Sequence, residues 1–196
     1  MAVTATDQEL VARVLEGEQQ VFAELVDRYQ RSVFNVTYRM LGEARAAEDA
    51  AQEAFLRAYQ HLSRYDMNRS FKTWLLSIAS NYCIDQLRKR RLTWLSLDEP
   101  LPPHPALNSS EVGPEKAAVL NEREQAVQDL INTLPPDYKA AVVLKYWYDM
   151  PYAQIAEALD TTESAIKSRL FRARQMLAEQ ARMGGVPSLI PILEGA

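Results

Sequence analysis

The sequence predicts an all-α protein that contains two small helical domains. Only 6 of the 196 residues are glycine, which suits long helices joined by short turns better than a fold with many hairpins. No proline occurs before Pro100, so nothing in the first half interrupts a helix. Apolar residues recur at steps of three and four, the period of a helix with one buried face.

Four helices are expected in the first half of the chain. They cover residues 7–17, 21–41, 47–62 and 71–91, and Gly17 and Gly42 end the first two. In the second helix the expected inward positions are Phe22, Leu25, Val26, Tyr29, Val33 and Val36. The polar stretch "SRYDMNRS", 63–70, is predicted to be a loop before the fourth helix, whose last turns are strongly basic.

The composition changes after residue 95, and the predicted domain boundary lies there. Residues 1–95 form the first domain, 96–114 a linker, 115–182 the second domain and 183–196 a tail. The linker region "SLDEPLPPHPALNSSEVGP" has five prolines, which argues against a packed core. The second domain is expected to contain helices over 115–134, 135–150, 151–159 and 161–182. The tail is expected to be frayed or loosely docked, and its apolar run "VPSLIPIL" could dock on another surface.

The net charge of −4 argues against a simple nucleic-acid binder, but the charges are unevenly distributed. Residues 66–95 contain six cations and two anions, and residues 161–182 contain five cations and two anions. The rest of the chain therefore has 11 cations against 22 anions, from totals of 22 and 26. Two basic regions lie in an otherwise acidic protein.

The second of these regions is predicted to be the second helix of a helix-turn-helix unit. The short helix 151–159 is expected to bury Tyr152, Ile155, Ala156 and Leu159, and the turn "LDTT" follows it. Asp160 tolerates the left-handed conformation that such a turn needs, and Thr161 or Thr162 can cap the next helix. That helix is expected to bury a narrow apolar stripe and to expose polar residues on its far side. Phe171 is expected on the exposed side too, where its apolar ring suits contact with a thymine methyl. The alternative is an ordinary solvated helix face.

Four blocks of sequence occur in a fixed order along the chain: "FAELVDRYQRSVFNVTYRMLG", "AEDAAQEAFLRAY", "FKTWLLSIASNYCIDQLRKRR" and "YAQIAEALDTTESAIKSRLFRARQML". Taken together, they resemble the extracytoplasmic-function (ECF) group of bacterial sigma factors, in the sigma-70 family. The resemblance covers about residues 7–182. It implies a sigma region 2 that recognises and melts the −10 element of a promoter, and a region 4 that recognises the −35 element.

The resemblance also implies partners and site residues. The partners would be core RNA polymerase, through its β′ clamp helices and β flap, promoter DNA, and an anti-sigma factor. The residues assigned to the −10 element are Tyr65, Asp66, Met67, Asn68, Arg69, Ser70, Lys72, Asn81, Arg88, Lys89, Arg90 and Arg91. Tyr65 could instead belong to the core, as Phe71 and Trp74 are expected to. The four cations at 88–91 could simply be solvated by water at the end of the helix, without a DNA contact.

The remaining assignments concern the −35 element and the polymerase. The residues assigned to the −35 element are Thr162, Ser164, Lys167, Ser168, Arg169, Phe171, Arg172 and Arg174. Asp160 and the run 162–164 depart from the family pattern there, which leaves the preferred sequence open. The residues assigned to polymerase docking are Glu48, Asp49, Gln52, Glu53 and Phe55, with a solvated acidic face as the alternative.

No cofactor or catalytic group is predicted. Cys83 is the single cysteine and is expected to be a small buried apolar residue, while His61 and His104 lie far apart, so no zinc-binding spacing exists. Neither a leader segment nor a membrane span is apparent, which predicts a soluble cytoplasmic protein. The competing function is a helix-turn-helix regulator that acts without polymerase, and an enzyme has almost no support.

Overall fold

Residues 5–95 and 116–183 are described by the structure, a computed structural model. Regular structure in these two ranges is helical throughout, which confirms the predicted all-α fold. The elements are α1 (Asp7–Leu15), η1 (Gln19–Val21), α2 (Phe22–Leu41), α3 (Ala44–Gln60), η2 (Leu62–Arg64), α4 (Phe71–Leu95), α5 (Lys116–Asn132), α6 (Pro136–Tyr146), α7 (Tyr152–Ala158) and α8 (Glu163–Met183). The predicted linker 96–114 and all of the tail except Met183 lie outside the described residues.

Local sequence signals set several helix ends. Thr6 and Glu9 form a capping box at the start of α1. Gly17 and Gly42 have positive φ angles of 110° and 75° after α1 and α2, as expected for residues that end a helix. At the start of α4, the Ser70 hydroxyl accepts a hydrogen bond from the backbone N–H of Thr73 at 3.3 Å.

The first unit is a bundle in which α2, α3 and α4 pack against one another. Leu25, Val33 and Val36 of α2 are buried as predicted. Five alanines of α3 are buried as well, and these small side chains let helix backbones approach closely. They are Ala47, Ala50, Ala51, Ala54 and Ala58. Thr37 is fully buried, and its hydroxyl donates to the carbonyl of Ala47 at 2.8 Å, which ties α2 to α3.

The second unit places α6 and α7 against α8. Ile155, Ala156 and Leu159 of α7 are buried, and so are Ile166 and Leu170 of α8. The turn between these helices has Asp160 in the left-handed conformation, with φ 46°. The helix-turn-helix arrangement predicted for this part of the chain is therefore present.

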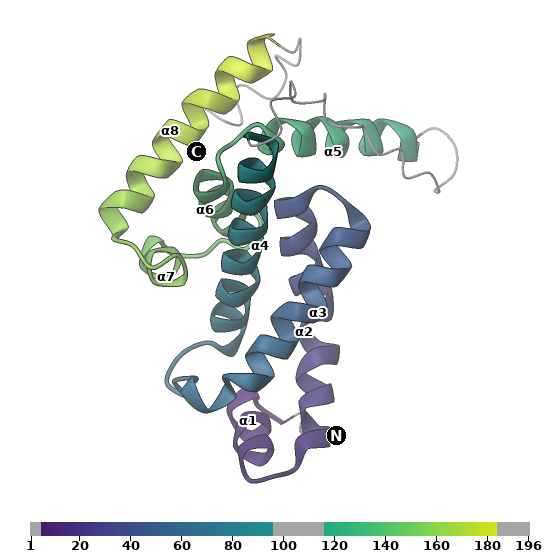
Figure 1. Cartoon of the computed structure of the whole chain (residues 1–196), viewed down its shortest axis with the longest axis vertical. Helices are drawn as coiled ribbons and strands as arrows, with labels where there is room; N and C mark the ends of the chain where they lie inside the picture. The colour runs from purple at the N-terminus through teal and green to yellow at the C-terminus, as the bar shows by residue number, and fades with distance from the viewer. Residues whose placement is uncertain (1–4, 96–115, 184–196) are drawn as a thin grey trace.

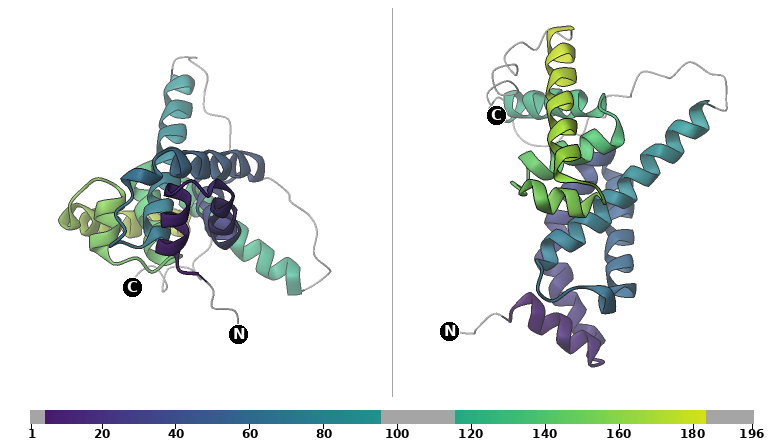
Figure 2. Two further views of the ribbon diagram at one scale, coloured as in Figure 1. Left: turned by 90° about the horizontal axis from the view of Figure 1, so that it is seen from below. Right: turned by 90° about the vertical axis from the view of Figure 1, so that its left-hand side faces the viewer.

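The two units pack directly on each other. Helix α4 contacts α2 and α3 on one side and α6 and α7 on the other, and α2 also contacts α5 and α6 (Figures 1 and 2). One apolar cluster extends from Leu10 in α1 to Leu177 in α8. Sequence periodicity finds the helices of each unit, but it does not indicate this contact between the units.

Candidate nucleic-acid and partner interfaces

Helix α8 begins with a hydroxyl cap. The Thr162 side chain accepts a hydrogen bond from the backbone N–H of Ala165 at 3.2 Å, so Thr162, rather than Thr161, is the capping residue. Glu163 lies in the first turn, where a negative charge complements the positive end of the helix. These contacts fix where the helix starts and hence which of its residues point outward.

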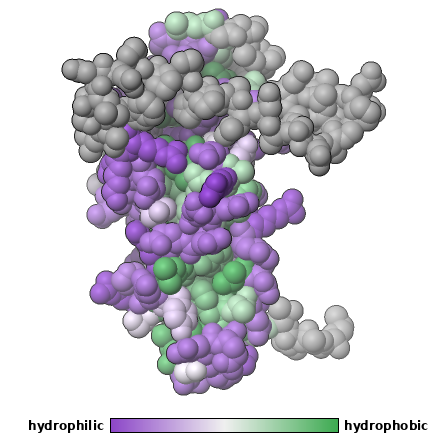
Figure 3. All heavy atoms as spheres, turned by 45° about the vertical axis from the view of Figure 1, so that its right-hand side comes forward, coloured by the Kyte–Doolittle hydropathy of each residue, from purple (hydrophilic) through white to green (hydrophobic). Residues whose placement is uncertain are grey.

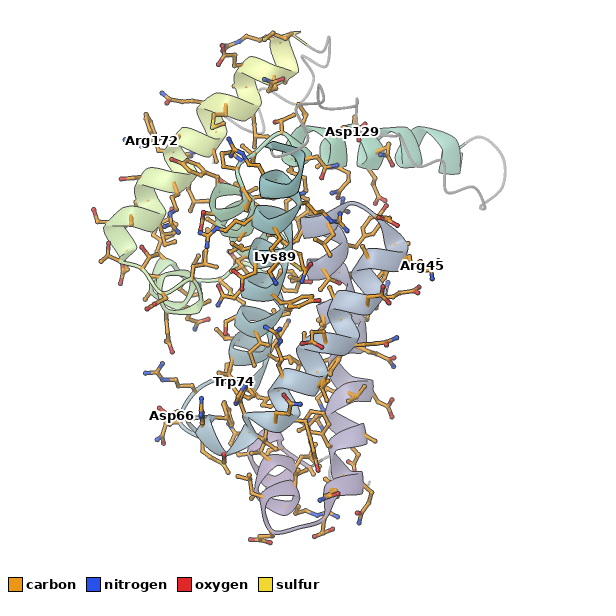
Figure 4. All side chains as sticks on the ribbon, viewed as in Figure 1. Arg45, Asp66, Trp74, Lys89, Asp129 and Arg172 are labelled. Carbon is orange, nitrogen blue, oxygen red and sulfur yellow. The ribbon has the colours of Figure 1, made fainter. Side chains whose placement is uncertain are left out.

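The outward face of α8 is open to solvent over its first three turns. Phe171 is 56% exposed, which is unusual for a large aromatic residue, and the Arg172 side chain projects away from α4 (Figure 4). Exposed with them are Ser164, Lys167 and Ser168, and Arg174 is half-buried. An uncovered helix face with hydroxyls, an aromatic ring and cations has the chemistry of a helix that enters the major groove of DNA.

Arg169 lies differently from its neighbours. It is half-buried, and one terminal guanidinium nitrogen, Nη1, is buried with no hydrogen-bond partner among the described residues. The residue lies beside the buried stripe of α8 and not at the centre of its outward face, so its assignment to the −35 group stays a prediction with less geometric support than the assignment of Arg172.

Tyr152 lies at the surface, in contrast to the position that the sequence pattern predicted for it. It was expected in the core, but its side chain is 38% exposed, and the ammonium groups of Lys145 and Lys167 lie over its ring at 5.6 and 5.7 Å. The prediction is wrong because Tyr152 is the first residue of α7, so no preceding helical turn covers its side chain. Tyr152 thus adds an exposed aromatic ring, in contact with two lysines, next to Lys167 of α8.

The loop 66–70 is organised by Asp66. Its carboxylate accepts hydrogen bonds from the backbone N–H and side-chain amide of Asn68, at 2.9 and 3.0 Å, and from Arg69 Nε at 3.2 Å. These hydrogen bonds, led by that from the Asn68 backbone, hold the pKa of Asp66 below its usual value. The loop is thus held by its own side chains while all five residues stay exposed, and Figure 4 shows Asp66 at its outer edge.

Tyr65 belongs to the core side of this loop. Its side chain is only 7% exposed and packs against Phe71 and Trp74, with ring centroids 5.4 and 5.2 Å away. The hydroxyl donates to the backbone carbonyl of Arg69. The sequence left two alternatives for Tyr65, a core residue or a ring that stacks on a base, and its burial favours the core residue. Phe71 is a core residue, as expected.

Asn81 and the basic end of α4 lie along one helix but have different surroundings. Asn81 is exposed, and its amide donates to the Ala158 carbonyl of α7 at 2.9 Å. Arg88 Nη2 lies 2.9 and 3.0 Å from the two carboxylate oxygens of Asp137 in α6. Arg90 and Arg91 are exposed, as is Lys89, whose place on α4 is labelled in Figure 4. Several residues assigned to promoter DNA therefore already contact the second unit.

The acidic face predicted on α3 is present. Glu48, Asp49 and Gln52 are exposed, and Glu53 is half-buried and paired with Arg57 at 2.7 Å. Phe55 packs partly against the core, as expected. One of the three carboxylates is therefore partly neutralised within its own helix, and Glu48 and Asp49 supply most of the accessible negative charge.

Apolar side chains extend this face beyond the residues that the sequence singled out. Leu56 is 51% exposed and Tyr59 is 37% exposed, both on α3. Figure 3, which turns the side of α2 and α3 forward, shows apolar surface between polar residues there. Exposed apolar residues beside charges are typical of protein–protein interfaces. Helical periodicity alone could have indicated them, since both lie outside the buried stripe of α3.

Cys83 is fully buried, as predicted, and burial raises the pKa of its thiol to about 12. Among the residues that the structure describes, no group of three His, Cys, Asp or Glu side chains could hold a metal ion. In the same residues, no helix is long and apolar enough to cross a membrane.

Taken together, the fold and these surfaces define a helical protein of two units, with an open helix-turn-helix face on one and an acidic, partly apolar helix face on the other. Residues 25–93 match the family model described as Sigma-70 region 2, and residues 124–177 match that described as Sigma-70, region 4. The chain belongs to the sigma-70 family and, within it, to the ECF group of RNA polymerase sigma factors.

Relatives of known name agree with this assignment over nearly the whole chain. The chain is 37% identical to the ECF RNA polymerase sigma factor SigW of Bacillus subtilis, over 88% of this chain and 95% of that protein. It is 32% identical to the ECF RNA polymerase sigma-E factor of Escherichia coli, over 90% and 95%. The fold is similar to that of CnrH, solved in complex with the cytosolic domain of CnrY, with a TM-score of 0.65, 22% identity and coverage of 90% and 97%.

Proposed function

We propose that this protein is a transcription initiation factor that binds core RNA polymerase in the cytoplasm and directs it to a subset of promoters. The observation that supports this most strongly is the presence of both sigma units in one chain, region 2 followed by region 4, with the recognition face of α8 exposed. A regulator acting alone would need only the helix-turn-helix unit and would leave the acidic face of α3 without a partner.

In this proposal the first unit opens the −10 element. The loop 66–70 and Asn81 supply donors and acceptors for the edge of a base that has left the DNA stack, and such a base needs a polar pocket. Lys72 and the cations at 88–91 neutralise phosphates nearby. Tyr65 contributes indirectly, because its hydroxyl fixes the backbone of Arg69.

The second unit places α8 in the major groove of the −35 element. Ser164, Lys167, Ser168 and Phe171 lie nearest the base edges, and Arg172 and Arg174 nearer the phosphates. Thr162 contributes the helix cap and a backbone close to the DNA. Arg169 stays a candidate on the rim of this surface.

Polymerase binding is assigned to α3. Glu48, Asp49, Gln52 and Glu53 would face basic residues on the β′ clamp helices, with Phe55 packing behind them, while the second unit docks on the β flap. A protein inhibitor of the anti-sigma kind is a further expected partner. This expectation is supported by a structural neighbour, RpoE of Bartonella quintana, which was solved in complex with the anti-sigma factor NepR and is 22% identical to this chain. CnrH, also 22% identical, was likewise solved with a bound protein, the cytosolic domain of CnrY.

Transcription in a purified system tests the proposed function. Core polymerase and this protein would be incubated with fragmented genomic DNA, and the transcripts sequenced. We expect transcripts that start downstream of shared −35 and −10 sequences and that core polymerase alone does not produce. Tight binding to duplex promoters without polymerase, with no effect of polymerase on transcription, would favour the free-standing regulator instead.

A further inference from the structure

Helix α1 lies at the end of the first unit that carries the loop 66–70. It contacts α2 and also η2, the short helix that ends directly before Tyr65. Figure 4 shows the labelled residues Asp66 and Trp74 at the same end of the unit. None of the residues assigned to DNA or to polymerase belongs to α1, so its role is open although it adjoins the segment that leads into the loop.

Asp7, the first residue of α1, attaches this helix to α2. Its carboxylate accepts hydrogen bonds from Arg28 Nη1 and from the Tyr29 hydroxyl, each at 2.5 Å. Arg28 Nη2 also donates to the Ala5 carbonyl at 2.8 Å. The Asp7 side chain is only 18% exposed, so solvent screens these contacts less than those of a surface ion pair. One carboxylate therefore holds two consecutive side chains of α2.

Tyr29 extends this attachment to the aromatic residues at the start of α4. Its ring is half-buried and lies 5.7 Å from the ring of Phe71, which is 1% exposed. Burial, together with the hydrogen bond to Asp7, raises the pKa of Tyr29, so the hydroxyl stays protonated and remains a donor. Tyr29 thus connects a carboxylate of α1 with a buried ring of α4.

Phe71 connects Tyr29 with the loop. The rings of Tyr65 and Phe71 meet edge to face, with centroids 5.4 Å apart, and the Tyr65 hydroxyl donates to the Arg69 carbonyl. Trp74 packs against both rings, at 5.2 and 5.7 Å. Because buried rings are closely packed and prefer particular orientations, a change in the position of Tyr29 alters the packing of the next two rings. The contacts that begin in α1 therefore end at the backbone of the −10 loop.

We propose that α1 positions the −10 loop, with Asp7 and Tyr29 as positioning residues that do not themselves touch DNA. They act through Phe71 and Tyr65, which hold the backbone of residues 66–70 in the conformation that receives the flipped base. The inference rests on the proposed function and adds α1 to it. A loop that is already ordered before DNA arrives loses less conformational entropy when the base binds, so capture of the base is more favourable.

The helix α1 has its own sources of stability, separate from this chain of contacts. Thr6 and Glu9 form its capping box, and Arg13 pairs with Glu18 at 2.7 Å just beyond its end. Loss of the Tyr29 hydroxyl alone therefore leaves α1 folded. This makes Tyr29→Phe, which keeps the ring, a variant that separates the positioning of the loop from the folding of the unit.

Hydrogen exchange in the free, full-length protein tests the positioning without any reference to transcription. The backbone N–H groups of Asn68 and Arg69 donate to Asp66 within the loop. In Tyr29→Phe, which loses the hydrogen bond to Asp7, we expect these two amides to exchange severalfold faster than in the wild-type protein, because the loop opens more often. Unchanged exchange of the loop amides would overturn the proposal, whatever transcription shows.

Tyr38→Phe is the matched control for this substitution. Tyr38 is a half-buried tyrosine of the same helix, and its ring stacks on Phe34 with centroids 6.0 Å apart. The control therefore removes one hydroxyl from α2 at a position outside the aromatic cluster of the loop. Loop exchange in Tyr38→Phe should equal that of the wild-type protein, and equal acceleration in both variants would show that the effect is not specific to Tyr29.

Promoter opening tests the consequence for function. At a promoter identified with the wild-type protein and core polymerase, Tyr29→Phe should open the DNA about threefold to tenfold more slowly, as expected for the loss of one hydrogen bond. Permanganate reactivity of unpaired thymines measures the rate, and binding to core polymerase should not change. Opening at the wild-type rate would overturn the inference, whereas a wild-type protein that initiates at no promoter would reject the proposed function itself.

A double-mutant cycle tests whether the two hydroxyls act along one chain of contacts. Tyr65→Phe removes the hydrogen bond to the Arg69 carbonyl, at the loop end of the chain. If Tyr29 acts through Tyr65, the double variant should open promoters no more slowly than the slower single variant, because residues of one network are not additive. Fold-changes that multiply would show two independent effects and would contradict positioning through the aromatic cluster.

Discussion

Lys139 of α6 has a buried side chain beside the first unit. Its side chain is 3% exposed, and its ammonium donates to Asn132 Oδ1 at 2.6 Å. The nearby Cys83 thiol is itself held neutral by burial, so it does not compensate the charge of the ammonium. Burial lowers the pKa of Lys139 from 10.5 to about 7. A buried lysine of this kind makes stability depend on pH.

We predict that Lys139→Met removes the contribution of this ammonium group to the pH dependence of the free energy of unfolding. Between about pH 7 and 10.5 the unfolded chain binds the proton and the folded chain does not, so wild-type stability rises with pH there, by up to about 1.4 kcal/mol per unit. Relative to wild type, Lys139→Met should therefore be most stable near pH 7 and lose this advantage toward pH 10. Urea unfolding of both proteins across this range measures the difference. Lys145→Met is the control, and a constant difference for Lys139→Met would contradict the prediction.

Asn81 is assigned to a flipped base of the −10 strand, and in the structure its amide donates to the Ala158 carbonyl of α7. We predict that Asn81→Ala impairs promoter opening, measured by permanganate reactivity of unpaired thymines, while binding to core polymerase is unchanged. Asn35→Ala, at an exposed asparagine of α2, should behave like wild type. Normal opening by Asn81→Ala would remove this residue from the −10 group.

At the scale of elements, α8 buries only a narrow stripe of side chains, so most of its remaining side chains are available to contact a partner. We predict that Arg172→Ala weakens promoter binding by the polymerase complex and reduces the slope of log K against log salt by about 0.9, the share of one phosphate contact. Binding would be measured by fluorescence anisotropy at several salt concentrations. Arg31→Ala on α2 should leave the slope unchanged, and an unchanged slope for Arg172→Ala would exclude a phosphate contact there.

Helix α3 is the corresponding element for the polymerase. Reversing the charges of Asp49 and Glu53 to lysine should weaken binding to core polymerase by about tenfold or more, because complementary charges become like charges. Asp27→Lys, at an exposed carboxylate of α2, is the matched control. Native-gel titration of core polymerase measures the effect. If the double variant binds core normally but fails to open promoters, α3 does not have the docking role.

At the scale of the whole molecule, the continuous apolar cluster across the two units predicts coupled unfolding. We expect a single calorimetric transition for the wild-type chain, with equal van't Hoff and calorimetric enthalpies. Arg39→Met, which loses the contacts to Gln128 and Trp147 but keeps an apolar stem, should lower the stability by about 1–2 kcal/mol. Two resolved transitions in the wild-type chain would show that the units are independent.

The sequence by itself determined the helices, the helix-turn-helix and the family. These features depend on local signals, such as periodic apolar residues, Gly17 and Gly42 at helix ends, and Thr162 before α8, and on blocks of residues in a fixed order. The tertiary structure decided which polar side chains already have partners. Tyr65 proved to be buried, Tyr152 exposed and in contact with two lysines, and Asn81 and Arg69 bound to residues of α7. The physical reason is that a helical period determines which side of a helix is apolar, whereas the surface that covers its polar side comes from residues distant in the chain.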